Sequence, residues 1–162
     1  TGYRIGYLAA PPEISGVVGK LHSQLTGAPN AISQEAFECA LAEEPAEVSD
    51  MVAEFDRRRE LVVKGLSDLG LPCELPKGAF YVFPDVSGLV GDGCVAEGFG
   101  PIADADALCE YLLEKAQVAL VPGSAFGNPE CLRISYAASD ETLREALDRI
   151  EKALAAEVYV RG

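Results

Sequence analysis

Hydrophobic residues recur at helical spacing through the first part of the chain, after a short opening block that follows a different pattern. The block Tyr3–Ala9 is aromatic and β-branched, which predicts a strand ended by the two prolines that follow it. Apolar spacing then predicts helices over residues 13–22 and 31–43, separated by a loop rich in Gly and Pro. A long amphipathic helix is predicted over 45–70, with a proline in its first turn and a glycine at its end.

The second half of the chain alternates short strands with helices. Strands alternating with helices indicate an α/β or α+β unit, in which the helices cover one side of a small sheet. The predicted elements are strands over 79–83, 118–121 and 132–136, an exposed glycine-rich loop over 87–100, a helix capped by Asp104 or Asp106, and a last helix capped by Ser139 or Asp140.

The long helix is the best candidate for a domain boundary, because it is long enough to bridge two lobes. We therefore expect residues 1–44 to be the end of one domain, 45–70 an interdomain helix, and 71–162 a second, smaller domain. The sequence begins with Thr1 rather than Met and enters a structured block at once. This start predicts a fragment, or a chain that has lost something upstream.

Charge and composition exclude several classes of function. The 162 residues contain 26 Asp and Glu against 13 Lys and Arg, a formal charge of −13 that disfavours nucleic acid and anionic membranes as partners. No apolar stretch reaches the roughly 18–20 residues that span a bilayer. The single histidine, His22, leaves little basis for a histidine metal site or a Ser-His-Asp triad. Widely spaced cysteines without a CxxC pair fit reduced thiols and a cytoplasmic protein: Cys39, Cys73, Cys94, Cys109 and Cys131.

Arginines stand out at three places along the chain. Arg4 stands between glycines and apolar residues, and Arg133 stands in the middle of a predicted strand. A guanidinium in such a setting requires an anionic partner, since burying it unpaired is costly. Spacing alone leaves two interpretations open, an internal salt bridge and a site that binds carboxylate or phosphate in two-pronged fashion. The basic run 57–59, with glutamates nearby, predicts a solvated helix face.

Four stretches, taken together, resemble one family. They read TGYRIGY (1–7), PKGAFYVFP (76–84), VALVPGSAFG (118–127) and LRISYA (132–137). In order and spacing they are similar to the class I/II pyridoxal-phosphate aminotransferases, the aspartate aminotransferase family of fold type I. The resemblance implies an α/β chain, the C-terminal part of that fold with an α+β small domain. It also implies that 1–44 is the end of the large cofactor-binding domain.

The resemblance implies roles for individual residues. Arg4 would pair with the phosphate of pyridoxal phosphate, Arg133 would hold the α-carboxylate of the amino-acid substrate, and Phe80 would line the substrate side of the pocket. The partner substrate would be a 2-oxo acid, in a ping-pong exchange of the amino group. The family works as a homodimer, so the loop 23–29 would approach the partner subunit's active site.

The family's Schiff-base lysine would stand five residues before Thr1, so the motif places it upstream of this sequence. None of the five lysines in the chain has the right context to replace it, and the chain alone is expected to be inactive. Ser23 stands where one subgroup carries an arginine for a dicarboxylate side chain. The amino donor therefore stays open among aspartate, aromatic, prephenate and alanine types.

Two other readings stay open. Related fold type I enzymes use the same two arginines to cleave C–S bonds or, like 1-aminocyclopropane-1-carboxylate (ACC) synthase, to form cyclopropane rings. A non-catalytic interaction or assembly fragment would explain the missing lysine, although such a fragment has no reason to keep both Arg4 and Arg133.

Overall fold

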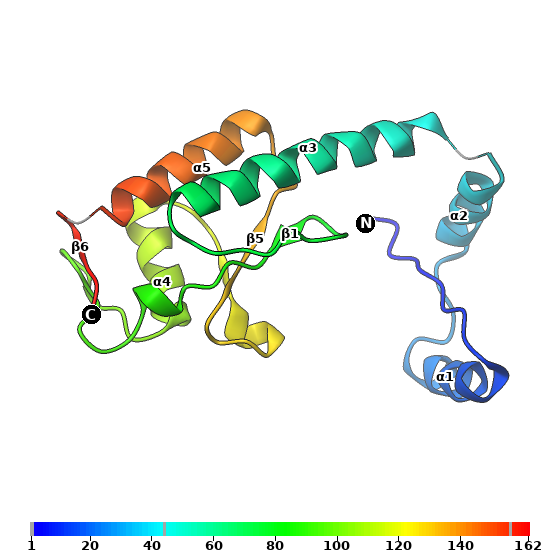
Figure 1. Ribbon diagram of the computed structural model, residues 1–162. Helices are drawn as coiled ribbons and strands as arrows, with labels where there is room; N and C mark the ends of the chain where they lie inside the picture. Colours follow the sequence, from blue (N-terminus) through cyan, green and yellow to red (C-terminus); the bar gives the residue numbers. More distant parts are fainter. Residues whose placement is uncertain (1, 44, 156) are drawn as a thin grey trace. The chain divides into compact units, whose positions relative to one another are not determined.

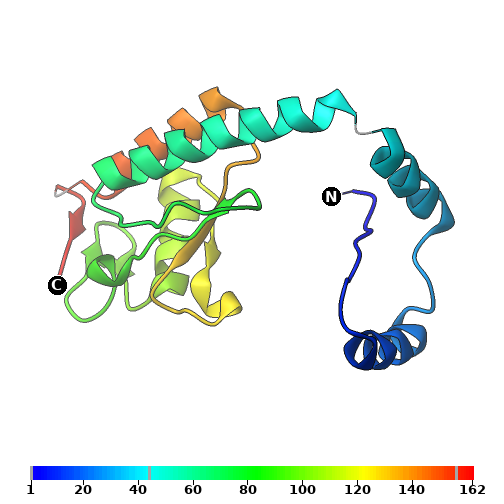
Figure 2. The same cartoon turned by 45° about the vertical axis from the view of Figure 1, so that its right-hand side comes forward.

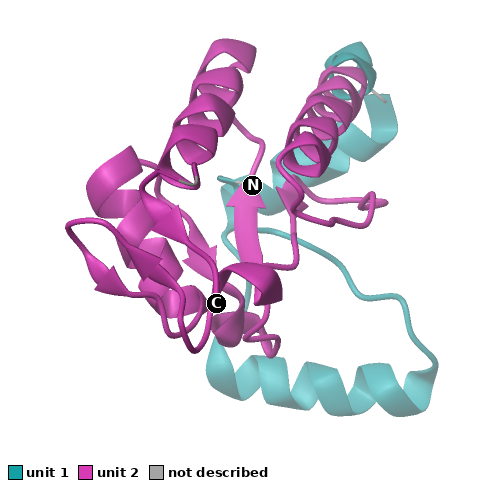
Figure 3. Cartoon of the chain, turned by 60° about the vertical axis from the view of Figure 1, so that its left-hand side comes forward, with its two compact units in different colours: residues 1–50 teal, residues 51–162 magenta. Residues whose placement is uncertain are grey.

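The computed structural model describes residues 2–43, 45–155 and 157–162, so the predicted boundary at residue 44 lies outside the described residues. The chain divides into two compact units, residues 1–50 and 51–162, which are coloured separately in Figure 3. No helix in the described ranges is long and apolar enough to cross a membrane.

The first unit contains the two predicted helices. They are α1 (Pro12–Leu25), which is longer than predicted, and α2 (Ala31–Glu43), which has the predicted bounds. A proline in the first turn favours the start of α1, because the missing N–H would have no partner there. The side chain of Asn30 accepts hydrogen bonds from the backbone N–H groups of Ile32 and Ser33 and so caps α2. Local signals therefore account for both helices.

The strand predicted over Tyr3–Ala9 is wrong, since no strand is formed there. The segment is held by α2 instead. The hydroxyl of Ser33 donates a hydrogen bond to the carbonyl of Tyr3 at 2.8 Å, and the rings of Tyr7 and Phe37 stack with centroids 6.2 Å apart. A β-prone sequence becomes a strand only beside a second strand that completes its hydrogen-bond ladder. The described residues provide no such neighbour for this segment.

The longest helices of the second unit run side by side. Figures 1 and 2 both show α5 (Asp140–Ala153) along α3 (Ala46–Asp68), a helix close to its prediction whose first residues precede this unit. Gly65 of α3 leaves the space that Leu147 of α5 fills, because a Cβ at Gly65 would collide with the Leu147 side chain. Small residues of this kind let two helix backbones approach closely.

Between these helices in sequence lies α4 (Ala105–Tyr111), which continues into a π-helical turn, η2 (Leu112–Ala116). The side chain of Asp104 accepts a hydrogen bond from the Ala107 N–H, and Ser139 caps α5 in the same way through the Thr142 N–H. The sequence left two candidates for each cap, and the structure selects Asp104 and Ser139.

A three-stranded antiparallel sheet has the order β1-β5-β4. Its strands are β1 (Tyr81–Val82), β4 (Val121–Pro122) and β5 (Leu132–Ser135), each shorter than predicted. One face packs against the helices through buried residues such as Val82 and Leu132. Because side chains alternate along a strand, the neighbours of these residues occupy the opposite face.

The stretch predicted as an exposed glycine-rich loop, residues 87–100, is instead partly buried structure. It contains a short 3₁₀ turn, η1 (Ser87–Leu89), and β2 (Val95–Ala96), and it runs into β3 (Gly100–Pro101). The second sheet has the order β3-β2-β6, where β6 (Tyr159–Val160) comes from the end of the chain. That distant pairing is what orders the stretch, and local glycine content could not reveal it.

Candidate anion-binding site

Arg133 projects from the face of β5 that is turned away from the helices. Its neighbours Leu132 and Ile134 pack into the core, so alternation along the strand sends the Arg133 side chain to the other face. There its Cζ lies 4.4 Å from the centroid of the Tyr81 ring and 4.1 Å from that of Phe126. The guanidinium is therefore held by two aromatic rings, one from β1 and one from the turn after β4.

The surroundings of Arg133 bear on the first of its two interpretations, the internal salt bridge. Within the described ranges no carboxylate oxygen lies within 4.0 Å of its guanidinium nitrogens, so it forms no internal salt bridge there. Rings stacked on the faces of a guanidinium stabilise its charge and leave the N–H groups at its edge available. Those N–H groups form a planar fork that matches both oxygens of a carboxylate. The geometry favours an anion-binding site.

The turn that carries Phe126 is built by a glycine. This turn, η3 (Gly123–Phe126), follows β4 directly. The N–H of Gly123 donates to the Cys131 carbonyl at 2.8 Å, and a Cβ at Gly123 would collide with the carbonyl oxygens of Asn128 and Cys131. Only glycine permits this approach, which brings Phe126 beside Arg133.

Phe80 lies next to this site rather than on the guanidinium. Its ring is 4.6 Å from the ring of Tyr81 and 5.9 Å from that of Phe55 on α3, measured between centroids. It therefore supports the ring that supports Arg133. Its contact with a substrate stays a prediction.

Arg4 belongs to the first unit. Its backbone adopts a φ of 52°, in the left-handed region that non-glycine residues rarely occupy. The hydrogen bond from Ser33 to the adjacent carbonyl of Tyr3 ties this segment to α2. The side chain of Arg4 is exposed.

The basic run on α3 is not merely solvated, as its sequence predicted. Arg57 bridges α3 to the start of α5 by pairing with Asp140, and it also pairs with Glu54. The Arg57 guanidinium holds the pKa of both carboxyls below their usual values. Arg58 shares these partners, while Arg59 pairs with Asp56 and donates to the Pro76 carbonyl at 2.7 Å.

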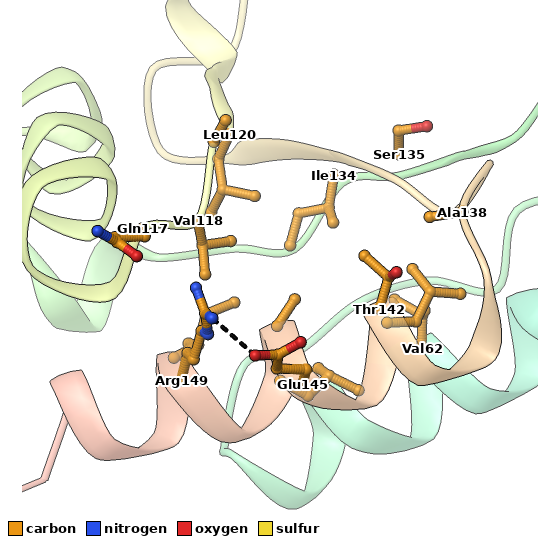
Figure 4. A pocket seen from close by; sticks show the side chains of 15 residues that line it. Val62, Gln117, Val118, Leu120, Ile134, Ser135, Ala138, Thr142, Glu145 and Arg149 are labelled. Carbon is orange, nitrogen blue, oxygen red and sulfur yellow. Dashed lines mark hydrogen bonds and ion pairs between the residues drawn. The ribbon is translucent and has the colours of Figure 1, made fainter.

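On the helix side of the sheet lies a separate cavity of about 270 Å³ between α5 and the strand region (Figure 4). Leu120 and Ile134 line its strand side and Thr142 its helix side, while Arg149 and Glu145 form an ion pair at its edge. Ile134 and Arg133 are adjacent on β5, so this cavity and the arginine occupy opposite faces of the strand.

The metal-ligating and thiol side chains of the described residues do not gather into a metal-binding cluster. These residues contain no group of three or more His, Cys, Asp or Glu that could hold a metal ion. All five cysteines are free thiols. Burial, with a contribution from Asp106, raises the pKa of Cys109 to about 11, which makes its thiol a poor nucleophile.

Comparison with known proteins assigns the chain to a family. A sequence profile of the family "Aminotransferase class I and II" matches residues 1–150. The chain belongs to this family. It is 49% identical over 158 residues to the aspartate aminotransferase of Pinus pinaster, an alignment that covers 95% of this chain and 32% of that relative.

Other proteins that the chain resembles are also aminotransferases. The Petunia hybrida protein named "Bifunctional aspartate aminotransferase and glutamate/aspartate-prephenate aminotransferase" is 46% identical, over 95% of this chain and 33% of its own length. The crystal structure of the aspartate aminotransferase from Rhizobium meliloti superposes with a TM-score of 0.77 at 43% identity, over 94% of this chain and 38% of that one. The chain thus spans about a third of the length of the relatives it matches, and it has the mixed α/β structure of the corresponding part of the aminotransferase fold.

The sequence analysis did not predict that Tyr81 and Phe126 contact Arg133. Tyr81 and Phe126 both lie inside stretches that carried the family resemblance, but their pairing with Arg133 depends on strand register. The register that pairs Tyr81 with Ser135 places Tyr81 two positions along from Arg133, within reach of a long side chain. A prediction that β1 pairs with β5 would have indicated that Tyr81 lies near Arg133.

Proposed function

We propose that the chain is the C-terminal portion of an aminotransferase that moves an amino group between an L-amino acid and a 2-oxo acid, with pyridoxal phosphate as cofactor. The observation that carries the proposal is the ring-stacked guanidinium of Arg133, which has no carboxylate partner in the described ranges. Relatives named aspartate aminotransferase, aligned over about 95% of the chain, support transamination over C–S cleavage or ring formation.

Arg133 binds the α-carboxylate in this proposal. The amino acid and the 2-oxo acid both carry that group, so one arginine serves both halves of the reaction. Two parallel N–H donors fix the orientation of the carboxylate as well as its position. The rings of Tyr81 and Phe126 hold the plane of the guanidinium and keep water from its faces, which strengthens its interaction with the anion.

Pyridoxal phosphate, when bound, supplies the electron sink that lets an amino acid lose its Cα proton. Arg4 fits the phosphate by its chemistry, since a guanidinium carries a positive charge and N–H donors that match phosphate oxygens. The lysines fit the cofactor less well. Lys64 and Lys152 are paired with Asp68 and Asp148 one helical turn away, and no lysine of the chain stands in the sequence context of the family's Schiff-base lysine. The isolated 162-residue chain is therefore expected to be inactive.

In the proposed parent enzyme, residues 1–44 end the large cofactor-binding domain, 45–70 form the interdomain helix and 71–162 form the small domain. The parent is a cytoplasmic homodimer in this proposal, and the loop 23–29 approaches the partner subunit's site. Helix α3 covers most of the proposed interdomain segment.

The test is a chimera in which this chain replaces the aligned 154 residues of the Rhizobium meliloti aspartate aminotransferase. We expect it to bind pyridoxal phosphate, detected by absorbance, and to transfer the amino group of aspartate to 2-oxoglutarate. Arg133→Lys should lower kcat/KM for both substrates by roughly 10- to 100-fold, because Lys cannot form the bidentate pair. Arg144→Lys, at an exposed site on α5, is the matched control and should leave kcat/KM unchanged.

The outcomes separate the alternatives. Equal kcat/KM in the Arg133→Lys and parent chimeras would overturn the carboxylate role. Release of ammonia and a thiol from a sulfur amino acid, without transfer to 2-oxoglutarate, would indicate a lyase. A folded chimera that binds the cofactor and transforms no amino acid would indicate a non-catalytic fragment.

A further inference from the structure

The loop that leads into β1 has an unfavourable backbone conformation. Ala79 adopts a φ of 60°, in the left-handed region, although it is not a glycine. This conformation is unfavourable for a residue that has a Cβ, and it persists only when the surroundings hold the residue in place. Something in the structure must therefore hold the loop 76–79.

Tyr136 holds the end of this loop through two consecutive carbonyls. Its backbone N–H donates to the carbonyl of Phe80 at 2.9 Å, and its hydroxyl donates to the carbonyl of Ala79, also at 2.9 Å. Tyr136 is only 2% exposed, so water competes little with this hydrogen bond. Burial also raises the pKa of Tyr136, which keeps the hydroxyl protonated and able to donate.

Arg59 holds the start of the same loop from α3. Its Nη1 donates to the Pro76 carbonyl at 2.7 Å, while its Nη2 pairs with Asp56 at 2.5 Å. The side chain of Arg59 is 20% exposed, whereas that of Asp56 is 55% exposed, so the ion pair lies at the protein surface. The two ends of a four-residue loop are thus bound to two different parts of the chain, the residue that follows β5 and helix α3.

The loop is followed at once by the rings that support Arg133. Phe80 stacks on Tyr81, and the Tyr81 ring lies against the Arg133 guanidinium. We propose that Tyr136 and Arg59 are positioning residues, which hold the loop 76–79 so that Tyr81 seats the guanidinium of Arg133. The inference rests on the proposed function for its importance to substrate binding, but the seating itself is a property of this chain alone.

The position of the Arg133 guanidinium over the two aromatic rings is measured by NMR on the full 162-residue chain. Protons on the Arg133 side chain lie over two aromatic rings and should show a strong upfield ring-current shift. In Tyr136→Phe, which removes only the hydroxyl, we expect more than half of that shift to be lost. Arg59→Lys, a second variant that keeps the charge, should lose a smaller part of it. Arg133→Lys, which removes the guanidinium, assigns the resonance.

Tyr111→Phe is the matched control. The Tyr111 side chain is as buried as that of Tyr136, and its hydroxyl also donates to a backbone carbonyl, that of Ala153, at 2.6 Å. We expect this variant to lose similar stability but to keep the Arg133 shift. An unchanged shift in both Tyr136→Phe and Arg59→Lys, or an equal loss in Tyr111→Phe, overturns the inference.

The chimera separates this inference from the proposed function. In an active chimera, Tyr136→Phe should raise KM for 2-oxoglutarate by roughly two- to tenfold with little change in kcat, because a carboxylate meets a poorly seated arginine. An inactive chimera whose chain still loses the shift in Tyr136→Phe upholds the positioning and counts against the function. A KM that stays constant while the shift is lost overturns the link between seating and substrate binding.

Discussion

The two units of the chain differ most in what they do with their apolar side chains. Every buried hydrophobic residue of the described chain lies in the second unit, from Val62 onward. In helices α1 and α2 the only buried residue is Ser33. Side chains such as Leu21 and Leu25 on α1 are 58% and 73% exposed. The first unit has helices with apolar faces but no core of its own.

This contrast shows that the interactions that form a helix differ from those that bury its apolar face. Caps, a proline in the first turn and helical spacing are enough to determine where α1 and α2 begin and end. A core also requires other elements to pack against the apolar face, and most of the stability of a helix in a protein comes from that packing. The second unit meets the requirement with α3, α4 and α5 against a sheet. Three experiments test the contrast, and a fourth tests an ion pair within the second unit.

The largest effect is expected from equivalent leucine truncations in the two units. Leu66→Ala, at a fully buried position of α3, should lower the free energy of unfolding by about 2–5 kcal/mol, through lost burial and the cavity left behind. Leu21→Ala, at an exposed position of α1, should change it by less than about 0.5 kcal/mol. Urea unfolding followed by circular dichroism measures both. Equal losses would show that α1 is covered, and would break the contrast.

Thiol reactivity is the next largest effect. Cys39 on α2 is exposed, whereas Cys109 on α4 is buried with a pKa raised from 9.0 to about 11. That rise alone lowers the thiolate fraction of Cys109 at pH 8 by about 100-fold. Brief alkylation followed by peptide mass spectrometry should label Cys39 well before Cys109. Urea should make both react, and slow labelling of Cys39 in native buffer would indicate a covered first unit.

Glycine substitutions should have opposite signs in the two units. Gly123→Ala forces a Cβ against the carbonyls of Asn128 and Cys131, and should lower the stability by about 1–3 kcal/mol. Gly16→Ala, in α1 with nothing within 4 Å, should raise helix stability by roughly 0.5–1 kcal/mol. Thermal unfolding checks both variants. A neutral Gly123→Ala would contradict the tight turn that places Phe126.

The smallest effect concerns the ion pair between α3 and α5. The Arg57 guanidinium lowers the pKa of Asp140 from its ordinary value of 3.8, so the pair stabilises the fold above that pH. The contribution is lost as the pH falls through the lowered value, because protonation of the folded carboxyl removes its charge. Asp140→Asn should therefore lower Tm slightly at pH 7 and not at strongly acidic pH.

Asp68→Asn is the control for this pair, since Asp68 pairs with Lys64 within α3 and joins no second element. Its effect on Tm should be smaller than that of Asp140→Asn at pH 7. A Tm difference between Asp140→Asn and the parent chain that persists unchanged in acid would show that Arg57 acts through packing rather than charge.

Sequence reasoning succeeded where the deciding interaction is local. The bounds of α2 and nearly those of α3 followed from apolar spacing, capping residues and glycine, all within a few positions along the chain. It failed where the partner is distant. The segment Tyr3–Ala9 has the composition of a strand but lacks a neighbouring strand, and residues 87–100 are ordered by β6, which lies about 60 positions further on.

The features of the candidate site also divide into those that local sequence predicts and those that depend on distant contacts. Arg133 could be singled out from the sequence alone, because a charged residue in the middle of a predicted strand requires a special environment. Whether that environment is an acidic partner or a pair of rings could not be decided, since Tyr81 and Phe126 are 52 and 7 positions away and meet it only through sheet register and a glycine turn. The roles of Tyr136 and Arg59 were invisible for the same reason.

Residue identity and spacing along the chain are enough to predict most of the helices, the acidic character of the chain, its family resemblance and the two arginines that stand out. Three further properties require the folded chain. Arg133 lies against two aromatic rings, the glycine-rich stretch contributes strands to a small sheet, and the apolar residues of one unit form a core while those of the other stay exposed. Those outcomes depend on which distant segments meet, and that is settled by packing and strand pairing over the whole fold.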